Sequence, residues 1–65
     1  GMNLSEYISH MRINKAKELL RQSDFKIHEI AAAVGFESAA YFTRVFKQLT
    51  QITPQEYRDS VMKKK

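Results

Sequence analysis

The sequence predicts an all-α fold, a small four-helix domain that contains one helix-turn-helix preceded by a long linking helix. Apolar residues recur at three- and four-residue intervals in four segments, and no segment alternates apolar and polar residues as a half-buried strand does. A glycine separates two such segments in the middle of the chain, which is typical of two helices joined by a tight turn. Because 65 residues make one domain at most, these helices must share one core.

The first helix is expected to run from about Leu4 to Arg21 as the linking helix. Asn3 is suited to cap it, and Glu6, three residues later, completes a capping box. Its apolar residues form two stripes on different sides of the cylinder. The stripe in the C-terminal half, which can pack on the helix-turn-helix, consists of Ile13, Ala16 and Leu20. The stripe in the N-terminal half, which has no evident companion in this chain, consists of Leu4, Tyr7, Ile8 and Met11.

These stripes allow two interpretations. Leu19 lies between them, which favours a single broad face that packs on one partner. Two separate stripes instead require two partners, and they predict that the N-terminal stripe is exposed within one chain. Contiguous exposed apolar patches are rare on soluble domains, so something should cover this one. We therefore expect this chain to self-associate, most simply as a two-fold pair of first helices, through Leu4, Tyr7, Ile8 and Met11.

Residues 22–26 are expected to connect the first helix to the second. Phe25 is expected to pack in the core and to hold this connector down. Lys26 stands immediately before the second helix, where a Ser or Thr cap would be expected, and this leaves Asp24 as the candidate to assist the helix start.

The second helix carries an apolar face at i, i+3, i+4, i+7 spacing, formed by Ile27, Ile30, Ala31 and Val34. Ala31 is small enough to let another helix cross closely over it. Gly35 is suited to end the helix in a left-handed conformation, and Phe36 is expected to fill the corner that follows.

The third helix is expected over about Ser38 to Leu49, with Ser38 as its cap. Its buried stripe is predicted to consist of Phe42, Val45, Phe46 and Leu49. The opposite face has no acidic residue, and it carries Ala40, Thr43, Arg44 and Lys47, with Ala39 and Tyr41 at its start. A major groove accepts a short helix that presents small, hydroxyl and cationic groups. We therefore interpret this segment as a recognition helix.

The last helix is expected from Pro54 to about Met62. A proline fits the first helical position because its missing N–H has no helical partner there, and Thr53 forms a second capping box with Glu56. The three lysines at 63–65 are expected to be a solvated basic tail.

Residues 51–57 echo residues 1–7 at an offset of fifty, with an apolar residue, a cap, a glutamate and a tyrosine in register. A tandem of helix-turn-helix units with this period would make the chain the second half of the tandem. The echo and the unpartnered stripe of the first helix point to the same conclusion.

The chain carries 11 lysines and arginines against 7 acidic residues, a net charge of +4 that suits a polyanionic partner, although a basic domain with no special partner would show the same balance. It has no cysteine and two separated histidines, so no disulfide, metal or cofactor site is predicted. The lack of cysteine fits a reducing cytoplasm. No apolar run long enough for a membrane span and no signal peptide is visible.

Four motifs occur in order over almost the whole chain. They are Lys15-Ala16-x-x-Leu19-Leu20, Ile27-x-Glu29-Ile30-Ala31-x-x-Val34-Gly35-Phe36, Tyr41-Phe42-x-Arg44-Val45-Phe46-Lys47 and Thr53-Pro54-x-Glu56-Tyr57-Arg58. As a set at this spacing they resemble the C-terminal DNA-binding region of AraC-type (AraC/XylS) bacterial transcription regulators. The resemblance implies two helix-turn-helix subdomains joined by a long helix, each placing one helix in successive major grooves on one face of double-stranded DNA. This chain corresponds to the linking helix and the second subdomain.

The resemblance and the helical face together give the candidate DNA-binding residues, which are Ser38, Ala39, Ala40, Tyr41, Thr43, Arg44 and Lys47. Arg44 is expected to contact a guanine and Lys47 a phosphate. Ala39 and Ala40 stand where the family often has polar groups, so apolar or permissive readout is expected there. Ser38 is expected to serve first as the helix cap.

Two further expectations concern the second half of the chain. Gln51 stands where the family commonly has glycine, which predicts a corner that is strained or that holds a non-glycine residue in the left-handed region. Arg58 is expected to pair with a nearby carboxylate rather than with DNA.

The sequence also bears on two other classes of function. An enzyme is disfavoured because the chain has no glycine-rich loop and no nucleophile with a nearby base, and its carboxylates are dispersed over helix surfaces. The stronger alternative is a helical protein-interaction module, for example one that contacts RNA polymerase, as this region can do in the family. Salt dependence separates the two, because phosphate binding weakens steeply with ionic strength and apolar helix binding does not.

Overall fold

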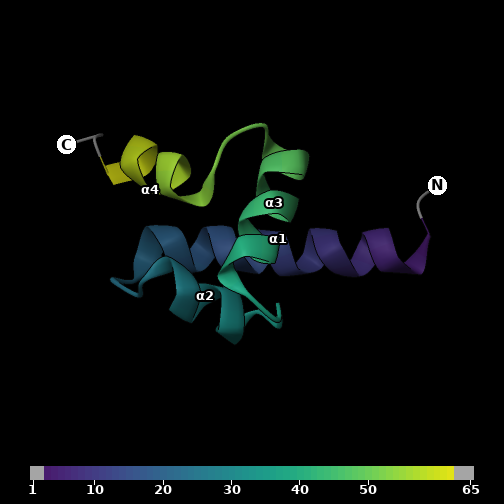
Figure 1. The fold of residues 1–65 in the computed structure, drawn as a ribbon. Coiled ribbons are helices and arrows are strands. Elements are labelled where there is room, and N and C mark those ends of the chain that lie inside the picture. Colours follow the sequence, from purple (N-terminus) through teal and green to yellow (C-terminus); the bar gives the residue numbers. More distant parts are fainter. Residues whose placement is uncertain (1–2, 63–65) are drawn as a thin grey trace.

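The computed structural model describes residues 3–62, which form four α-helices joined by short connections (Figure 1). The helices are α1 (Leu4–Gln22), α2 (Ile27–Ala33), α3 (Ala39–Thr50) and α4 (Pro54–Met62). The all-α fold and the order of its elements are thus as predicted, with helix ends shifted by about one residue from those expected. The predicted basic tail, residues 63–65, lies outside the described residues.

The long helix α1 is the scaffold of the fold. It packs against each of the other three helices, and α3 also contacts α2 and α4. Figure 1 shows α3 crossing the middle of α1, with α2 and α4 on opposite sides of its C-terminal half. The N-terminal half of α1 extends beyond α2 and α4 in this view.

The core lies where α2 and α3 meet the second half of α1. The buried apolar residues are Ile13, Ala16, Leu20, Ile30, Ala31, Val34, Phe36, Phe42, Val45 and Phe46. Aromatic rings run through this core in tilted and edge-on contacts. The Phe42 ring centroid lies 5.4 Å from that of Phe36 and 5.8 Å from that of Phe46, which lies 5.8 Å from that of Tyr57. The row of rings connects the corner before α3 to α4.

The predicted buried stripes of α2 and α3 are confirmed except at their ends. Ile27 and Leu49 are only partly buried against the core, because each lies at the edge of the helix crossing. Ala31 is almost completely buried, which confirms that a small residue is placed where α2 meets its neighbours.

Reciprocal hydrogen bonds confirm both predicted capping boxes. The Glu6 N–H donates to Asn3 Oδ1 at 2.9 Å, and the Asn3 N–H donates to Glu6 Oε1 at 3.3 Å. Before α4, the Glu56 N–H donates to Thr53 Oγ1 at 3.0 Å and the Thr53 N–H donates to Glu56 Oε1 at 2.9 Å. Each box satisfies two N–H groups that a helix start leaves without helical partners.

The start of α2 differs from the expectation, whereas the end of α3 agrees with it. The Lys26 N–H donates to Glu29 Oε1 at 2.7 Å, so Glu29 rather than Asp24 supports the first turn of α2. Gln51 has a φ of 75°, and its N–H donates to the Lys47 carbonyl oxygen at 2.8 Å. A non-glycine residue therefore ends α3 in the left-handed region, as the sequence predicted.

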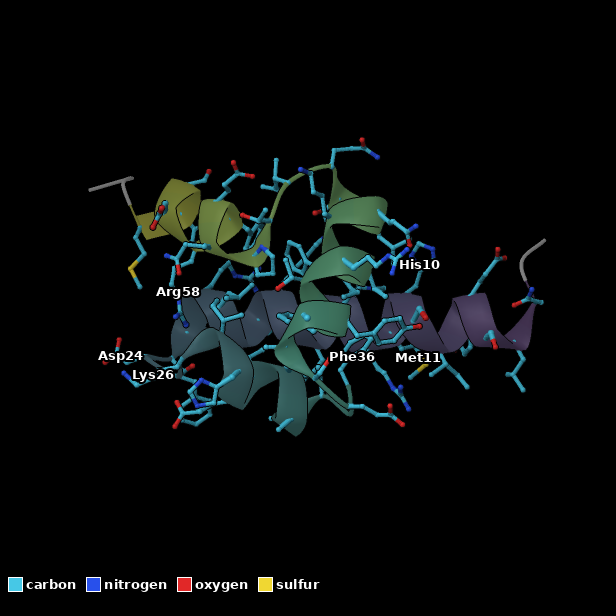
Figure 2. The ribbon with its side chains drawn as sticks, viewed as in Figure 1. His10, Met11, Asp24, Lys26, Phe36 and Arg58 are labelled. Carbon is cyan, nitrogen blue, oxygen red and sulfur yellow. The ribbon has the colours of Figure 1, made fainter. Side chains whose placement is uncertain are left out.

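The expectations for Phe25 and Arg58 are wrong, for one shared reason. The Arg58 guanidinium donates hydrogen bonds to the carbonyl oxygens of Leu20 (3.2 Å), Ser23 (3.1 Å) and Phe25 (2.7 Å), and it has no carboxylate partner within residues 3–62. These carbonyls lie at the end of α1 and in the connector, where helical partners run out. Arg58 thus holds the connector through backbone carbonyl oxygens. The Phe25 side chain does not enter the core and is 47% exposed. Figure 2 shows Arg58 beside this end of α1.

The N-terminal stripe of α1 is exposed within the chain, as the two-stripe interpretation predicted. Leu4 is 72% exposed and Met11 54%, whereas Ile13 and Leu20 of the other stripe are buried. A single broad face is therefore wrong, although Leu19 between the stripes does pack partly against the core. No helix within residues 3–62 is both long and apolar enough to cross a membrane.

Truncation of Phe46 tests whether the aromatic row holds the fold together. Phe46 is fully buried, so Phe46→Ala should lower the free energy of unfolding by about 3–5 kcal/mol and leave much of this small domain unfolded. Phe25→Ala removes the same atoms from an exposed position and should change stability by only about 0.5 kcal/mol. Thermal and urea unfolding followed by circular dichroism measure both, and equal losses would contradict the assigned core.

Candidate nucleic-acid interface

The corner between α2 and α3 fixes where α3 begins. Gly35 has a φ of 100°, and the Phe36 N–H donates to the Ala31 carbonyl oxygen at 2.9 Å, which closes the end of α2. The Phe36 side chain is buried in the corner, as predicted. Ser38 Oγ then accepts a hydrogen bond from the Tyr41 N–H at 3.1 Å, so Ser38 is the N-cap of α3.

Burial gives α3 a core side and an outer face. The core side consists of Phe42, Val45 and Phe46, which are all buried. Ala40, Arg44 and Lys47 are exposed on the opposite side, where a rotation of about 100° per residue places them within roughly 60° of one another. We call these three residues the outer face of α3. The small Ala40 side chain leaves room for another molecule to approach the helix backbone closely, and the two long cations lie beside it.

The remaining predicted contact residues lie around this outer face rather than on it. Thr43 is half-buried on one flank, and Tyr41 is 53% exposed on the other, with its ring edge-on to Phe36. Ala39 is half-buried and packs against the core. The Ser38 hydroxyl is occupied as the cap. The structure thus brings three of the seven predicted residues to the centre of one surface and two to its flanks, while Ala39 and Ser38 contribute to the helix itself.

One residue of this surface was missed by the sequence analysis. Gln48 lies one turn after Arg44, is exposed, and makes no side-chain hydrogen bond within residues 3–62. A glutamine amide can donate to and accept from an adenine edge. The i, i+4 spacing from Arg44 was the available signal, but a polar uncharged side chain on a helix surface is so common that the spacing did not distinguish it.

The cations of the outer face are not neutralised by neighbours. Within residues 3–62 one ion pair is formed, on α1, where Lys15 Nζ lies 3.5 Å from Glu18 Oε1. Arg44 and Lys47 have no carboxylate partner there, and the first turn of α3 contains no acidic residue. Their charges are therefore available to an anion.

A hollow of about 250 Å³ flanks the outer face, between α1 and α3. It is lined by Ser5, Glu6, Ser9 and His10 from α1 and by Tyr41, Val45, Gln48 and Leu49 from α3. His10 lies beside α3 in Figure 2. Within residues 3–62 no three histidine, aspartate or glutamate side chains come together as metal ligands, so the hollow does not have the composition of a metal site.

Comparison with known proteins gives one consistent result. A helix-turn-helix domain family matches residues 1–60. The HTH-type transcriptional regulator YijO of Escherichia coli is 42% identical over 58 residues, and the regulatory protein PocR of Salmonella typhimurium is 39% identical over 61 residues. The transcriptional activator RhaR of Cronobacter sakazakii is 47% identical over 58 residues. These matches cover 89%, 94% and 89% of this chain, which spans only 20% of the length of each relative.

Solved structures share the fold closely. The C-terminal domain of the two-component response regulator yesN from Fusobacterium nucleatum has a TM-score of 0.86 and 45% identity, with 89% of this chain and 56% of that chain covered. An AraC-type transcriptional regulator from Chromobacterium violaceum has a TM-score of 0.93 and 32% identity, with 100% of this chain and 58% of that chain covered. With a family match over 60 residues and a shared fold, the chain belongs to the AraC-type family of helix-turn-helix transcription regulators.

Proposed function

We propose that α3 is the recognition helix of this chain and enters the major groove of double-stranded DNA with its outer face. Membership of the family assigns the chain to DNA binding in the regulation of transcription. The observation that carries the assignment of α3 is its outer face, where Arg44 and Lys47 lie beside a small residue without a carboxylate partner in the described part of the chain. The opposite side of α3 is fully occupied by the core, so α3 can present only this face to the groove.

The side chains of the outer face differ in what they can read. Arg44 can form two parallel hydrogen bonds to guanine O6 and N7, which makes it the residue for base readout. Lys47 lies one turn away and carries a compact charge on a flexible stem, which suits a phosphate. Ala40 permits close approach and can touch a thymine methyl group. We assign supporting contacts to the flanks, at Tyr41, Thr43 and Gln48.

We further propose that this chain acts as one unit of a two-unit DNA-binding domain. It spans a little over half of the solved AraC-type chain that it matches over its whole length. The exposed stripe of α1, at Leu4, Tyr7, Ile8 and Met11, is an apolar surface that a neighbouring unit would cover. A single unit touches only a few phosphates, so its affinity should be modest and strongly dependent on salt.

The affinity of the chain for duplex DNA tests this assignment. We expect a dissociation constant of roughly 10⁻⁴ to 10⁻⁶ M near physiological salt, because few phosphates are contacted and one recognition helix is available. The affinity should fall steeply and linearly on a logarithmic salt scale in a fluorescence-anisotropy titration. A variant that ends at Met62 controls for the three terminal lysines and should keep most of the salt dependence. Affinity that does not change with salt would instead favour a helical protein-interaction module, such as one that contacts RNA polymerase.

Base readout and phosphate contact can be separated by two substitutions. On a site selected from a random duplex pool, Arg44→Ala should weaken binding by about 1–3 kcal/mol and flatten the preference at one base pair. Lys47→Ala should weaken all sequences alike and lower the salt slope by about one unit. Lys15→Ala, which removes a lysine that is paired with Glu18 on α1, is the matched control and should do neither. Identical behaviour of the Arg44 and Lys47 variants on selected and scrambled sites would refute this division of roles.

We also propose a second partner, which is another copy of this chain bound through the exposed stripe of α1. Sedimentation equilibrium of the chain at high concentration should show a dimer, because a self-complementary helix face closes on itself by two-fold symmetry. Ile8→Lys should weaken the dimer without lowering the melting temperature of the monomer, since Ile8 is exposed within one chain. Phe25→Lys places the same charge on an exposed apolar residue elsewhere and should leave the dimer intact. A monomer at all concentrations, or equal effects of both variants, would exclude this pairing.

A further inference from the structure

Arg12 on α1 contacts the corner between α2 and α3, and neither the core nor the proposed DNA-binding surface includes this residue. Its Cζ atom lies 5.7 Å from the centroid of the Phe36 ring. A Cβ atom placed on Gly35 would lie 3.2 Å from Arg12 Nε and 3.3 Å from its Cζ, so the guanidinium also lies against the Gly35 backbone. The guanidinium therefore contacts two successive residues, Gly35 and Phe36, of the corner between α2 and α3. Arg12 takes part in no ion pair and no hydrogen bond within residues 3–62, so the contacts of its guanidinium there are with the Phe36 ring and the Gly35 backbone.

The covered ring is itself in contact with the start of α3. The Phe36 centroid lies 5.7 Å from that of Tyr41, with an interplanar angle of 64°, and 5.4 Å from that of Phe42. Tyr41 is in the first turn of α3 and flanks the outer face. Arg12, Phe36 and Tyr41 thus form a continuous series of contacts from α1 to the edge of the proposed DNA-binding surface. Loss of the guanidinium would uncover one side of the Phe36 ring and so change the packing next to the Tyr41 ring.

The chemistry of Arg12 points to orientation rather than to simple burial. A guanidinium is planar and stacks on an aromatic face, whereas a lysine ammonium of the same charge has no flat surface. Gly35 has no Cβ, so the guanidinium can lie against the turn without the close contact of 3.2 Å that a Cβ there would make. Neither contact is needed to cover the core, because Arg12 is exposed while the neighbouring Ile13 is buried.

We propose that Arg12 is a positioning residue for DNA readout: packed against Phe36 and Gly35, it fixes the orientation of Tyr41 at the start of α3 and so links the placement of α1 to base selection. The proposal rests on the proposed function of α3. Loss of these contacts should alter discrimination between sites more than it alters general affinity for DNA.

The first test needs no DNA. The NMR signals of the Tyr41 ring, assigned with a Tyr41→Phe variant, should show the ring-current shift that the neighbouring Phe36 ring produces. In the Arg12→Gln and Arg12→Lys variants these signals should move towards the values of an unpacked tyrosine. Arg21→Gln is the matched control on the same helix. Arg21 donates a hydrogen bond to the Tyr57 hydroxyl at 3.4 Å, so this variant should move the Tyr57 signals and leave those of Tyr41 in place.

The second test measures the ratio of affinities for a selected and a scrambled site. Arg12→Lys and Arg12→Gln should both reduce this ratio, by roughly 2- to 30-fold, with the affinity for scrambled DNA and the salt slope unchanged. Unmoved Tyr41 signals would overturn the proposal, and so would variants that only lower the melting temperature. A salt slope that falls by about one unit in Arg12→Gln and is restored in Arg12→Lys would also overturn it, because Arg12 would then be a phosphate contact. Failure of the wild-type chain to bind DNA contradicts the proposed function itself, and it is distinguishable because the Tyr41 signals are measured on the free protein.

Discussion

The burial of Phe42 and Phe46 between α1, α2 and α4 is the interaction on which the rest of this structure depends. A chain of 65 residues without cysteine buries only about 60% of the surface that it exposes when unfolded, so it has little stability beyond what one small core supplies. The two rings lie in a row that begins at Phe36 in the corner and ends at Tyr57 on α4. That row holds together four helices, two of which have fewer than ten residues. Isolated helices of this length are marginal in water, so α2 and α4 persist because they pack on the row.

The same packing decides which side of α3 is presented outward. Phe42, Val45 and Phe46 recur at three- and four-residue spacing, and their burial turns Ala40, Arg44 and Lys47 away from the core. The corner sets where α3 begins, because Gly35 adopts a positive φ and Ser38 caps the helix. Stability and the DNA contact that we propose therefore use opposite sides of one helix. Substitutions on the outer face should leave the core intact, because none of its residues is buried.

At the C-terminal end of α1 the contacts are hydrogen bonds rather than apolar packing. Arg58 of α4 donates to three carbonyl oxygens at the end of α1 and in the connector, which are groups that the helix cannot satisfy itself. The connector is thereby held by its backbone, and its one large apolar side chain, Phe25, is left exposed. At the other end, α1 projects past the core with Leu4 and Met11 uncovered. The two ends of α1 therefore differ: the C-terminal end is hydrogen-bonded to α4, and the N-terminal end exposes apolar side chains. We propose that a neighbouring unit or a second copy packs on the N-terminal end.

The sequence by itself determined the four helices, the N-caps of α1, α3 and α4 and the core side of α3, because these depend on local spacing and on residue types with strong preferences at helix ends. It also placed Ala40, Arg44 and Lys47 on one face, since helical periodicity alone fixes which residues share a face. It gave Phe25 and Arg58 the wrong partners, because an arginine that binds carbonyls 33 to 38 residues away leaves no local pattern. Spacing also could not show that Thr43 is half-buried, that the Tyr41 ring packs on Phe36, or that Arg12 reaches Phe36. Those details were decided only by the tertiary structure, since the angle at which α3 crosses α1 sets which side chains of the two helices meet.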